Sequence, residues 1–173
     1  QIVVLDKTGT VTSGIPVVTD IRPAAGVSEG ELLRLAAALE EKSEHPLGKA
    51  IRQRAREAQL TLPETADFQA LPGHGLTAVV EGERLFGGSR AFVGGKAALP
   101  KALEEAADAL AEEGKTPLFF TRENAPLGLI AVADTLREDS AAAIGELKAM
   151  GLRVVMLTGD NRRTAAAIGR AAG

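Results

Sequence analysis

The fold is decided at the start of the chain, where Ile2–Thr10 reads IVVLDKTGT. Four consecutive aliphatic residues are typical of a strand that is covered on both faces, as in a parallel sheet. A polar, glycine-containing turn follows and puts Asp6 at the carboxyl end of this strand, the end beyond which open parallel sheets bind their ligands. The stretch therefore predicts an α/β fold with a candidate reactive carboxylate at Asp6.

A second stretch of the same kind lies near the end of the sequence. Residues 153–157 read RVVML and are followed by Thr158-Gly159-Asp160. Apolar residues at helical spacing lie on both sides of this strand, over 143–150 and 164–172. We therefore expect the two ends of the chain, residues 1–15 and 133–173, to form one α/β domain that is split by an insertion.

The insertion, residues 16–132, predicts a small α+β domain. Ser28 begins a capping box with Glu31, and Pro46 and Pro100 are each typical of a helix start. Alternating or apolar runs between turns predict strands over 77–80, 84–86, 117–121 and 126–133. We expect these helices to flank an antiparallel sheet.

Composition excludes several classes of protein. The chain has 173 residues, a net charge of -3, no cysteine and 3% aromatic residues. This excludes disulfides, thiolate zinc sites and thiol nucleophiles, and it argues against a nucleic-acid partner. The apolar runs are too short to cross a bilayer. Because the chain enters a core strand with no lead-in, we expect a segment of a longer protein.

The residues at the two strand ends suit phosphoryl chemistry. Asp6 could be a metal ligand, a nucleophile or a turn former, and a lone Asp after a strand is most often a turn residue. Lys7, Thr8 and Thr10 add a charge and hydroxyls that suit a phosphoryl group. Residues 158–160 add another hydroxyl and carboxylate. The combination of two such motifs favours a nucleophile over a turn former.

At this point the sequence resembles a known family, the P-type ATPases. DKTGT at 6–10 resembles their phosphorylation motif, TGD at 158–160 their second motif, and DTLR at 134–137 their hinge. SEHP at 43–46 and GHG at 73–75 resemble motifs of the heavy-metal-transporting branch. The resemblance covers essentially the whole chain. It implies a partial, doubly wound, haloacid-dehalogenase-like phosphorylation domain that is interrupted by a nucleotide-binding domain.

The resemblance also implies roles for individual residues, with ATP and Mg²⁺ as cofactors. Asp6 would attack the γ-phosphorus of ATP, and its carboxylate would hold Mg²⁺ together with the carbonyl oxygen of Thr8. The catalytic residues implied are Asp6, Lys7, Thr8, Thr158, Gly159 and Asp160. The nucleotide-binding residues implied are Glu40, His45, Gly73, Gly75 and Gly88.

Two other classes of function stay open at this stage. A stand-alone aspartyl phosphatase places a second Asp two residues after its nucleophile as an acid-base, and here that position is Thr8. A nucleotide-binding module without chemistry is the other alternative. The family's next motif, with a further Mg²⁺-binding Asp, and its downstream Lys would follow Gly173. We therefore expect this segment to bind nucleotide with negligible turnover.

The resemblance further implies a metal pump as the whole protein. The SEHP wording and the segment at 154–157 favour copper export, while zinc, cadmium and lead pumps share nearly all the motifs. The partners implied are ATP and the actuator and membrane domains of the pump, and the transported metal is not bound by this segment. The location implied is the cytoplasmic part of an integral plasma-membrane protein.

Some residues also have simpler interpretations. His45, just before Pro46, could serve only as a helix N-terminal residue. His74 lies at the variable centre of the GxG loop, so we expect it to be exposed and not a ligand. The four cations Lys49, Arg52, Arg54 and Arg56 are expected to form a solvated helix face.

Overall fold

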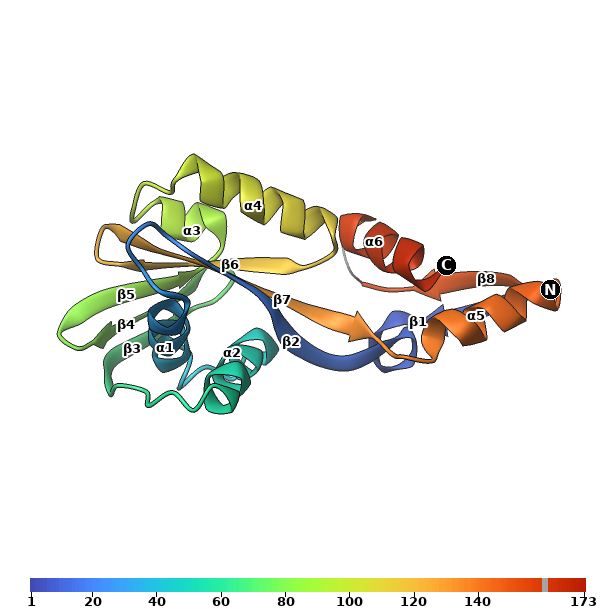
Figure 1. Cartoon of the computed structure of the whole chain (residues 1–173), viewed down its shortest axis with the longest axis horizontal. Coiled ribbons are helices and arrows are strands. Elements are labelled where there is room, and N and C mark those ends of the chain that lie inside the picture. Colours follow the sequence, from blue (N-terminus) through green and yellow to red (C-terminus); the bar gives the residue numbers. More distant parts are fainter. Residues whose placement is uncertain (160–161) are drawn as a thin grey trace.

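The computed structural model describes residues 1–159 and 162–173. They form a large lobe around a six-stranded sheet and a small lobe around a two-stranded sheet. Two long strands, β2 (Thr12–Pro23) and β7 (Ala125–Leu136), run from one lobe to the other (Figure 1). No helix in the described part of the chain is long and apolar enough to cross a membrane.

The six-stranded sheet is antiparallel throughout, with the order β2-β7-β6-β5-β4-β3. Its other strands are β3 (Thr65–Leu71), β4 (Gly75–Val80), β5 (Glu83–Gly88) and β6 (Thr116–Arg122). Glu81 and Gly82 form the β4–β5 turn, and both have the positive φ that a two-residue hairpin requires. The structure confirms the predicted hairpin and the predicted strands at 117–121 and 126–133.

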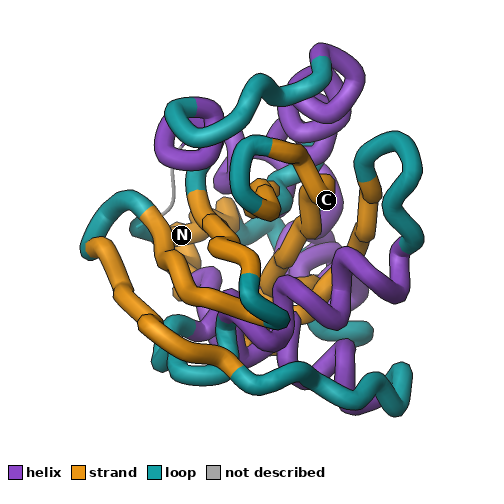
Figure 2. The backbone as a smooth tube through the Cα atoms, turned by 90° about the vertical axis from the view of Figure 1, so that its left-hand side faces the viewer, coloured by secondary structure: helices purple, strands orange, loops and turns teal. Residues whose placement is uncertain are grey.

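Helices cover both faces of this sheet (Figures 1 and 2). On one face lie α1 (Glu29–Leu39) and α2 (Pro46–Glu57), and on the other α3 (Arg90–Gly94) and α4 (Lys101–Glu112). Successive strand residues point to opposite faces. Thus Phe120 packs in the core with α1 and α2, while Phe119 packs in the core with α4.

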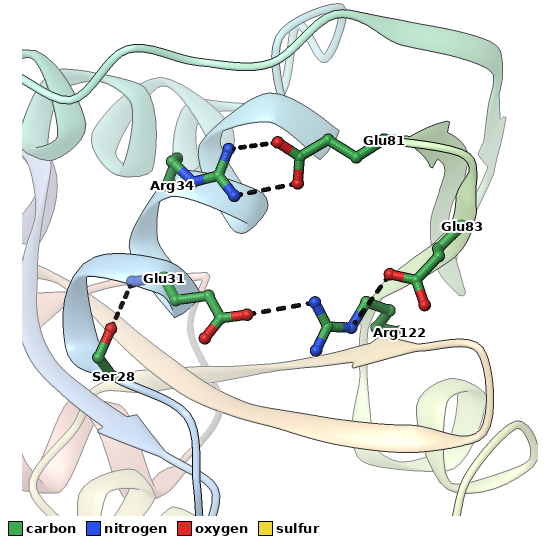
Figure 3. Close-up of polar contacts among 6 residues, drawn as sticks. All are labelled: Ser28, Glu31, Arg34, Glu81, Glu83 and Arg122. Atoms are coloured by element: carbon green, nitrogen blue, oxygen red, sulfur yellow. Dashed lines mark hydrogen bonds and ion pairs between the residues drawn. The ribbon is translucent and has the colours of Figure 1, made fainter.

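Helix α1 is fixed to the sheet by polar contacts (Figure 3). The Ser28 hydroxyl caps the helix by accepting the Glu31 N–H at 3.1 Å. The guanidinium of Arg34 donates to both carboxylate oxygens of Glu81, at 2.8 and 3.0 Å. Arg122 of β6 donates to the Glu31 carboxylate at 3.2 Å. These contacts hold the N-terminal half of α1, and the helix ends at Leu39, directly before Glu40.

We expect Ser28→Ala to lower the free energy of unfolding by about 1 kcal/mol, because the Glu31 N–H loses its acceptor. Ser28→Asp is the matched control, since its carboxylate can cap the same N–H. Chemical denaturation of both variants measures the difference. Equal loss in the two variants would contradict the capping role.

The small lobe contains the parallel pair of strands that the sequence predicts. β1 (Ile2–Asp6) pairs with β8 (Arg153–Leu157), and α5 (Ser140–Ala149) and α6 (Arg162–Ala172) accompany them. Leu5, Val154 and Met156 pack against a core of α5 and α6 residues. The expectation that β1 is covered on both faces is wrong, since Ile2 is 62% exposed and Val4 59% exposed. The described helices pack on the other face of this sheet.

The paired strands β2 and β7 connect the two lobes, and side-chain hydrogen bonds stabilise them where they pass from one lobe to the other. The Asp134 carboxylate accepts the Thr12 hydroxyl at 2.5 Å and the Gly14 N–H at 2.9 Å. A further contact lies between α4 and α6, where Arg170 donates to the Glu112 carbonyl oxygen. β2 and β7 run unbroken through the expected domain limits near residues 15 and 132. That division stays a prediction.

Candidate functional site

The small lobe places the phosphorylation motif at the carboxyl ends of its strands. Asp6 ends β1 and lies opposite Leu157, the last residue of β8, so Thr158 follows at the same edge. The irregular turn Lys7–Val11 comes next. Asp6 and Thr8 are exposed, whereas Lys7 is buried. The structure therefore brings Asp6 and Thr158 to one edge, with exposed Gly159 after them, and Asp160 lies outside the described residues.

The turn after Asp6 is supported from β2. Gly9 adopts a left-handed φ of 78°, which glycine reaches without strain. A Cβ on Gly14 would lie 3.2 Å from the Cα of Gly9, so the two backbones are in close contact. The Asp134 carboxylate of β7 accepts the Gly14 N–H. This hydrogen bond fixes the part of β2 that lies against the turn.

The oxygen atoms at and near Asp6 are suited to bind a hard cation. The exposed carboxylate of Asp6 and the carbonyl oxygen of Thr8 are both oxygen ligands, and Mg²⁺ in proteins is commonly held by one or two carboxylates with several waters retained. Within residues 1–159 and 162–173, no group of three or more His, Cys, Asp or Glu side chains could hold a metal. Oxygen atoms of this kind suit Mg²⁺ better than a metal that prefers thiolate or imidazole ligands.

The large lobe contains a cavity of about 670 Å³ at the junction of α1 and α2. The β3–β4 loop and the end of β5 complete its walls. Its size is typical of a small-molecule site. The structure brings together here all the residues that the sequence assigned to nucleotide binding: Glu40, His45, Gly73, Gly75 and Gly88.

Among the described residues that line this cavity, Glu40 has a buried carboxylate oxygen with no hydrogen-bond partner. It follows the last turn of α1 and is 5% exposed, and its Oε2 has no hydrogen-bond partner. Burial raises the pKa of its carboxyl, against the opposing effects of the Ser43 hydroxyl and the Arg52 charge. A buried acceptor without a partner is costly. Glu40 is thus suited to accept a hydrogen bond from a ligand.

His45 caps α2 and also lines the cavity. Its Nδ1 accepts the Leu47 N–H at 3.2 Å. A neutral imidazole that accepts at Nδ1 carries its proton at Nε2. The capping bond confirms the structural role of His45 and leaves Nε2 as a donor, so the cap does not exclude a binding role.

Glycine is required in this cavity for two different reasons: close packing between strands at Gly75 and Gly88, and a left-handed backbone conformation at Gly73. Gly75 and Gly88 face each other across β4 and β5. A Cβ on Gly75 would lie 2.2 Å from the Gly87 carbonyl oxygen, and one on Gly88 2.6 Å from the His74 carbonyl oxygen. Gly73 has open space around it but a φ of 76°. His74 is exposed, as expected, and lies at the rim.

Sequence reasoning missed several residues of this cavity. Ser43 is buried and lines the cavity, and Gly48 lies behind it, where a Cβ would be 2.3 Å from the Glu40 Oε2. The glycine two residues after Pro46 was a signal for this close packing. Phe68 was missed together with β3, whose mostly exposed residues give no apolar alternation.

The expectation that Arg52 belongs to a solvated face is wrong. Its Nη1 lies 2.5 Å from the Glu40 carbonyl oxygen and 2.8 Å from that of Ser43. The negative end of α1 attracts a cation to this position. The other cations of the run, Lys49, Arg54 and Arg56, are exposed as expected.

A second cavity of about 650 Å³ lies between β2 and α2. Lys49, Arg54 and Arg56 line it, and their charges suit an anion. In the part of the chain that the structure describes, however, no buried side chain without a hydrogen-bond partner borders this groove. The glycine-lined cavity is therefore the better candidate for a heterocyclic ligand that donates hydrogen bonds.

Comparison with known proteins agrees with this geometry. Residues 1–173 match the family described as haloacid dehalogenase-like hydrolase. The chain belongs to the haloacid dehalogenase-like hydrolase family. The expected α/β fold, with an inserted antiparallel sheet and flanking helices, is confirmed.

Relatives of this haloacid dehalogenase-like chain include metal pumps. A copper-exporting P-type ATPase of Staphylococcus aureus (strain MRSA252) is 42% identical over 172 residues, which are 99% of this chain and 21% of that protein. The chain thus spans about a fifth of the length of the curated relatives it matches.

Solved structures similar to this haloacid dehalogenase-like chain are also P-type ATPases. A zinc-transporting PIB-type ATPase in the E2.Pi state superposes with a TM-score of 0.88 and 44% identity, covering 99% of this chain and 28% of that chain. The N-domain of a copper-transporting P-type ATPase superposes with a TM-score of 0.60 and 30% identity, covering 68% of this chain and 99% of that one.

Proposed function

We propose that this chain is the nucleotide-binding and phosphorylation region of a heavy-metal-exporting P-type ATPase. The observation that carries the proposal is the cavity that brings buried Glu40, with an unpartnered oxygen, together with His45 and the glycines. The similarity to P-type ATPases over 99% of the chain supports it. In this account, ATP binds in the large lobe and phosphorylates the small lobe.

Adenine recognition follows from the donors and acceptors of the cavity. The Glu40 carboxylate, whose buried Oε2 lies against Gly48 and has no partner in the free chain, is the acceptor for the exocyclic amino group, and the His45 Nε2–H is available as a donor. Leu47 and Phe68 provide apolar surface against the ring. At Gly73 the absence of a side chain lets the nucleotide approach the backbone, whereas at Gly75 it lets β4 pack against β5 at the edge of the cavity.

Phosphoryl transfer takes place at Asp6. A carboxylate oxygen of Asp6 attacks the γ-phosphorus, the bond from phosphorus to the β–γ bridging oxygen breaks, and ADP leaves with that oxygen. Asp6 and the Thr8 carbonyl oxygen would hold Mg²⁺, which would supply charge neutralisation when bound. Lys7 follows Asp6 in the chain, and Thr158 lies at the same edge of the small sheet. Thr8 cannot act as a general acid-base at neutral pH, so the aspartyl phosphate persists.

The transported metal is copper in our proposal, because the curated relatives are copper-exporting ATPases. Zinc is the alternative, since the zinc-transporting structure is 44% identical. In either case this region faces the cytoplasm, works with actuator and membrane domains, and does not bind the transported ion. Phosphorylation of the intact pump in membranes, stimulated by copper(I) or by zinc(II), distinguishes the two metals.

Labelling of the intact pump with γ-phosphate-labelled ATP tests the function. We expect Mg²⁺-dependent, acid-stable label on Asp6, its absence in Asp6→Asn, and nucleotide binding in both proteins. Label that persists in Asp6→Asn would contradict the proposed nucleophile.

We expect His45→Asn to weaken ATP binding about five- to thirtyfold, the loss of one hydrogen bond of 1–2 kcal/mol. Asparagine keeps an acceptor that can cap α2 but is too short to reach the ligand, so the fold stays intact. Calorimetric titration of the chain with ATP measures the change. An unchanged affinity in folded His45→Asn would remove His45 from the site.

A further inference from the structure

Arg52 differs from its basic neighbours on α2 because it points toward the C-terminal end of α1. Its Nη1 lies 2.5, 3.0 and 2.8 Å from the carbonyl oxygens of Glu40, Glu41 and Ser43. The nitrogen carries two hydrogens, so at least one hydrogen is shared between acceptors. Three carbonyl groups of one short turn therefore converge on a single cation.

Arg52 donates to carbonyl groups at the end of α1 and in the turn that follows, and of these the Glu40 carbonyl oxygen also accepts the Ser43 N–H at 2.9 Å. The last carbonyl groups of a helix have no partner within it, and they form the negative end of its dipole. Glu40 is the C-terminal cap of α1, and α2 begins at Pro46. The Arg52 guanidinium therefore donates hydrogen bonds to the carbonyl oxygens of the segment that joins the two helices, and its charge offsets the negative end of the α1 dipole.

The same turn carries the polar side chains of the cavity. The Ser43 hydroxyl accepts the His45 N–H at 3.3 Å, and the Ser43 N–H donates to the Glu40 carbonyl oxygen at 2.9 Å. A shift of the Ser43 backbone would therefore move both Glu40 and His45. Arg52 itself lines the groove between β2 and α2 and not the glycine-lined cavity.

We infer that Arg52 is a positioning residue for nucleotide binding: by holding the carbonyl oxygens of turn 40–43, it fixes Glu40 and His45 in the arrangement that receives the adenine ring. The inference rests on the proposed function of the cavity. Arg52 makes no contact with the nucleotide in this account. Its contribution is pre-organisation, which lowers the cost of ordering the site when the ligand binds.

Calorimetric titration with ATP tests the inference in the wild-type chain and three variants. We expect Arg52→Met to weaken binding about tenfold, since the turn must then be ordered by the ligand. Arg52→Lys should recover most of the affinity, because an ammonium can donate to the same carbonyl groups. Arg54→Met is the matched control, since Arg54 is an exposed cation of the same helix, and it should bind ATP as the wild type does.

Hydrogen exchange separates positioning from a general loss of stability. In Arg52→Met we expect faster exchange at residues 41–45 and unchanged exchange in β6 and β7. If Arg52→Met does not fold, Arg52→Gln, a shorter neutral donor, takes its place. Unchanged ATP affinity in the folded variant, beside a wild type that binds, would overturn the inference alone. A wild type that does not bind ATP would overturn the proposed function and the inference with it.

Discussion

Replacement of Gly75 by alanine should lower the free energy of unfolding by about 3 kcal/mol, the upper end of the usual cost of overpacking. The added Cβ would lie 2.2 Å from the Gly87 carbonyl oxygen and 2.7 Å from the Phe92 ring. The carbonyl group belongs to the neighbouring strand and cannot rotate away. β4 and β5 must therefore separate at the edge of the cavity, and ATP affinity should fall as well.

Gly73→Ala is the matched control for the stability change. Gly73 is two residues away, has a φ of 76° and has nothing within 4 Å of the position of a Cβ. Only the left-handed backbone conformation opposes the methyl group, at a cost of about 1–2 kcal/mol. Urea denaturation of both variants measures the difference. Equal destabilisation of the two variants would show that β4 and β5 can accommodate the added methyl group, which would contradict the close contact between Gly75 and the Gly87 carbonyl oxygen.

Replacement of Glu40 by glutamine should have opposite effects on stability and on binding. The variant removes a buried charge with an unpartnered oxygen, so the free chain should gain about 1 kcal/mol of stability at neutral pH. It also weakens the acceptor for the adenine amino group, and ATP should bind about tenfold less tightly. Thermal unfolding and calorimetric titration measure the two changes.

Glu44→Gln provides the control for this pair of effects. Glu44 lines the same cavity but is exposed, so the loss of its charge should change neither stability nor affinity appreciably. If Glu40→Gln destabilised the free chain, its carboxylate would be better satisfied than the structure indicates.

The pH dependence of stability follows from the same carboxyl. Burial raises the pKa of Glu40 in the folded chain above the value of about 4.3 in an unfolded chain. Between these two pKa values the folded state binds more protons. The free energy of unfolding therefore has a contribution from Glu40 that falls as pH rises from about 4.3 through the raised pKa. In Glu40→Gln this decrease should be absent.

Much of the fold could be predicted because the local signals agree with the tertiary structure. Ser28 caps α1 as its capping box predicts, and Glu81-Gly82 gives the β4–β5 hairpin. The cavity residues were found through short motifs, because Glu40, His45 and the glycines lie at spacings that resemble a family pattern. Their contacts were not predictable from spacing alone.

What could not be predicted depends on contacts between distant segments. β3 carries mostly exposed residues, so its apolar pattern is weak and only its pairing with β4 defines it. Arg52 lies in the same run of basic residues as the exposed cations of α2, so the sequence does not distinguish it from them. Only the packing of α2 against the end of α1 gives it three acceptors. The exposure of Ile2 and Val4 likewise depends on which face the helices of the small lobe cover.

Amide chemical-shift mapping of ATP binding tests the central claim most directly, because the described residues enclose two cavities of similar size, the glycine-lined one and the basic groove. We expect ATP to shift the amide signals of residues 40–48, 71–76 and 87–89 around the glycine-lined cavity, and His45→Asn to need about five- to thirtyfold more ATP for the same shifts. Shifts confined to residues 14–18 and 49–57, around the basic groove between β2 and α2, would contradict it.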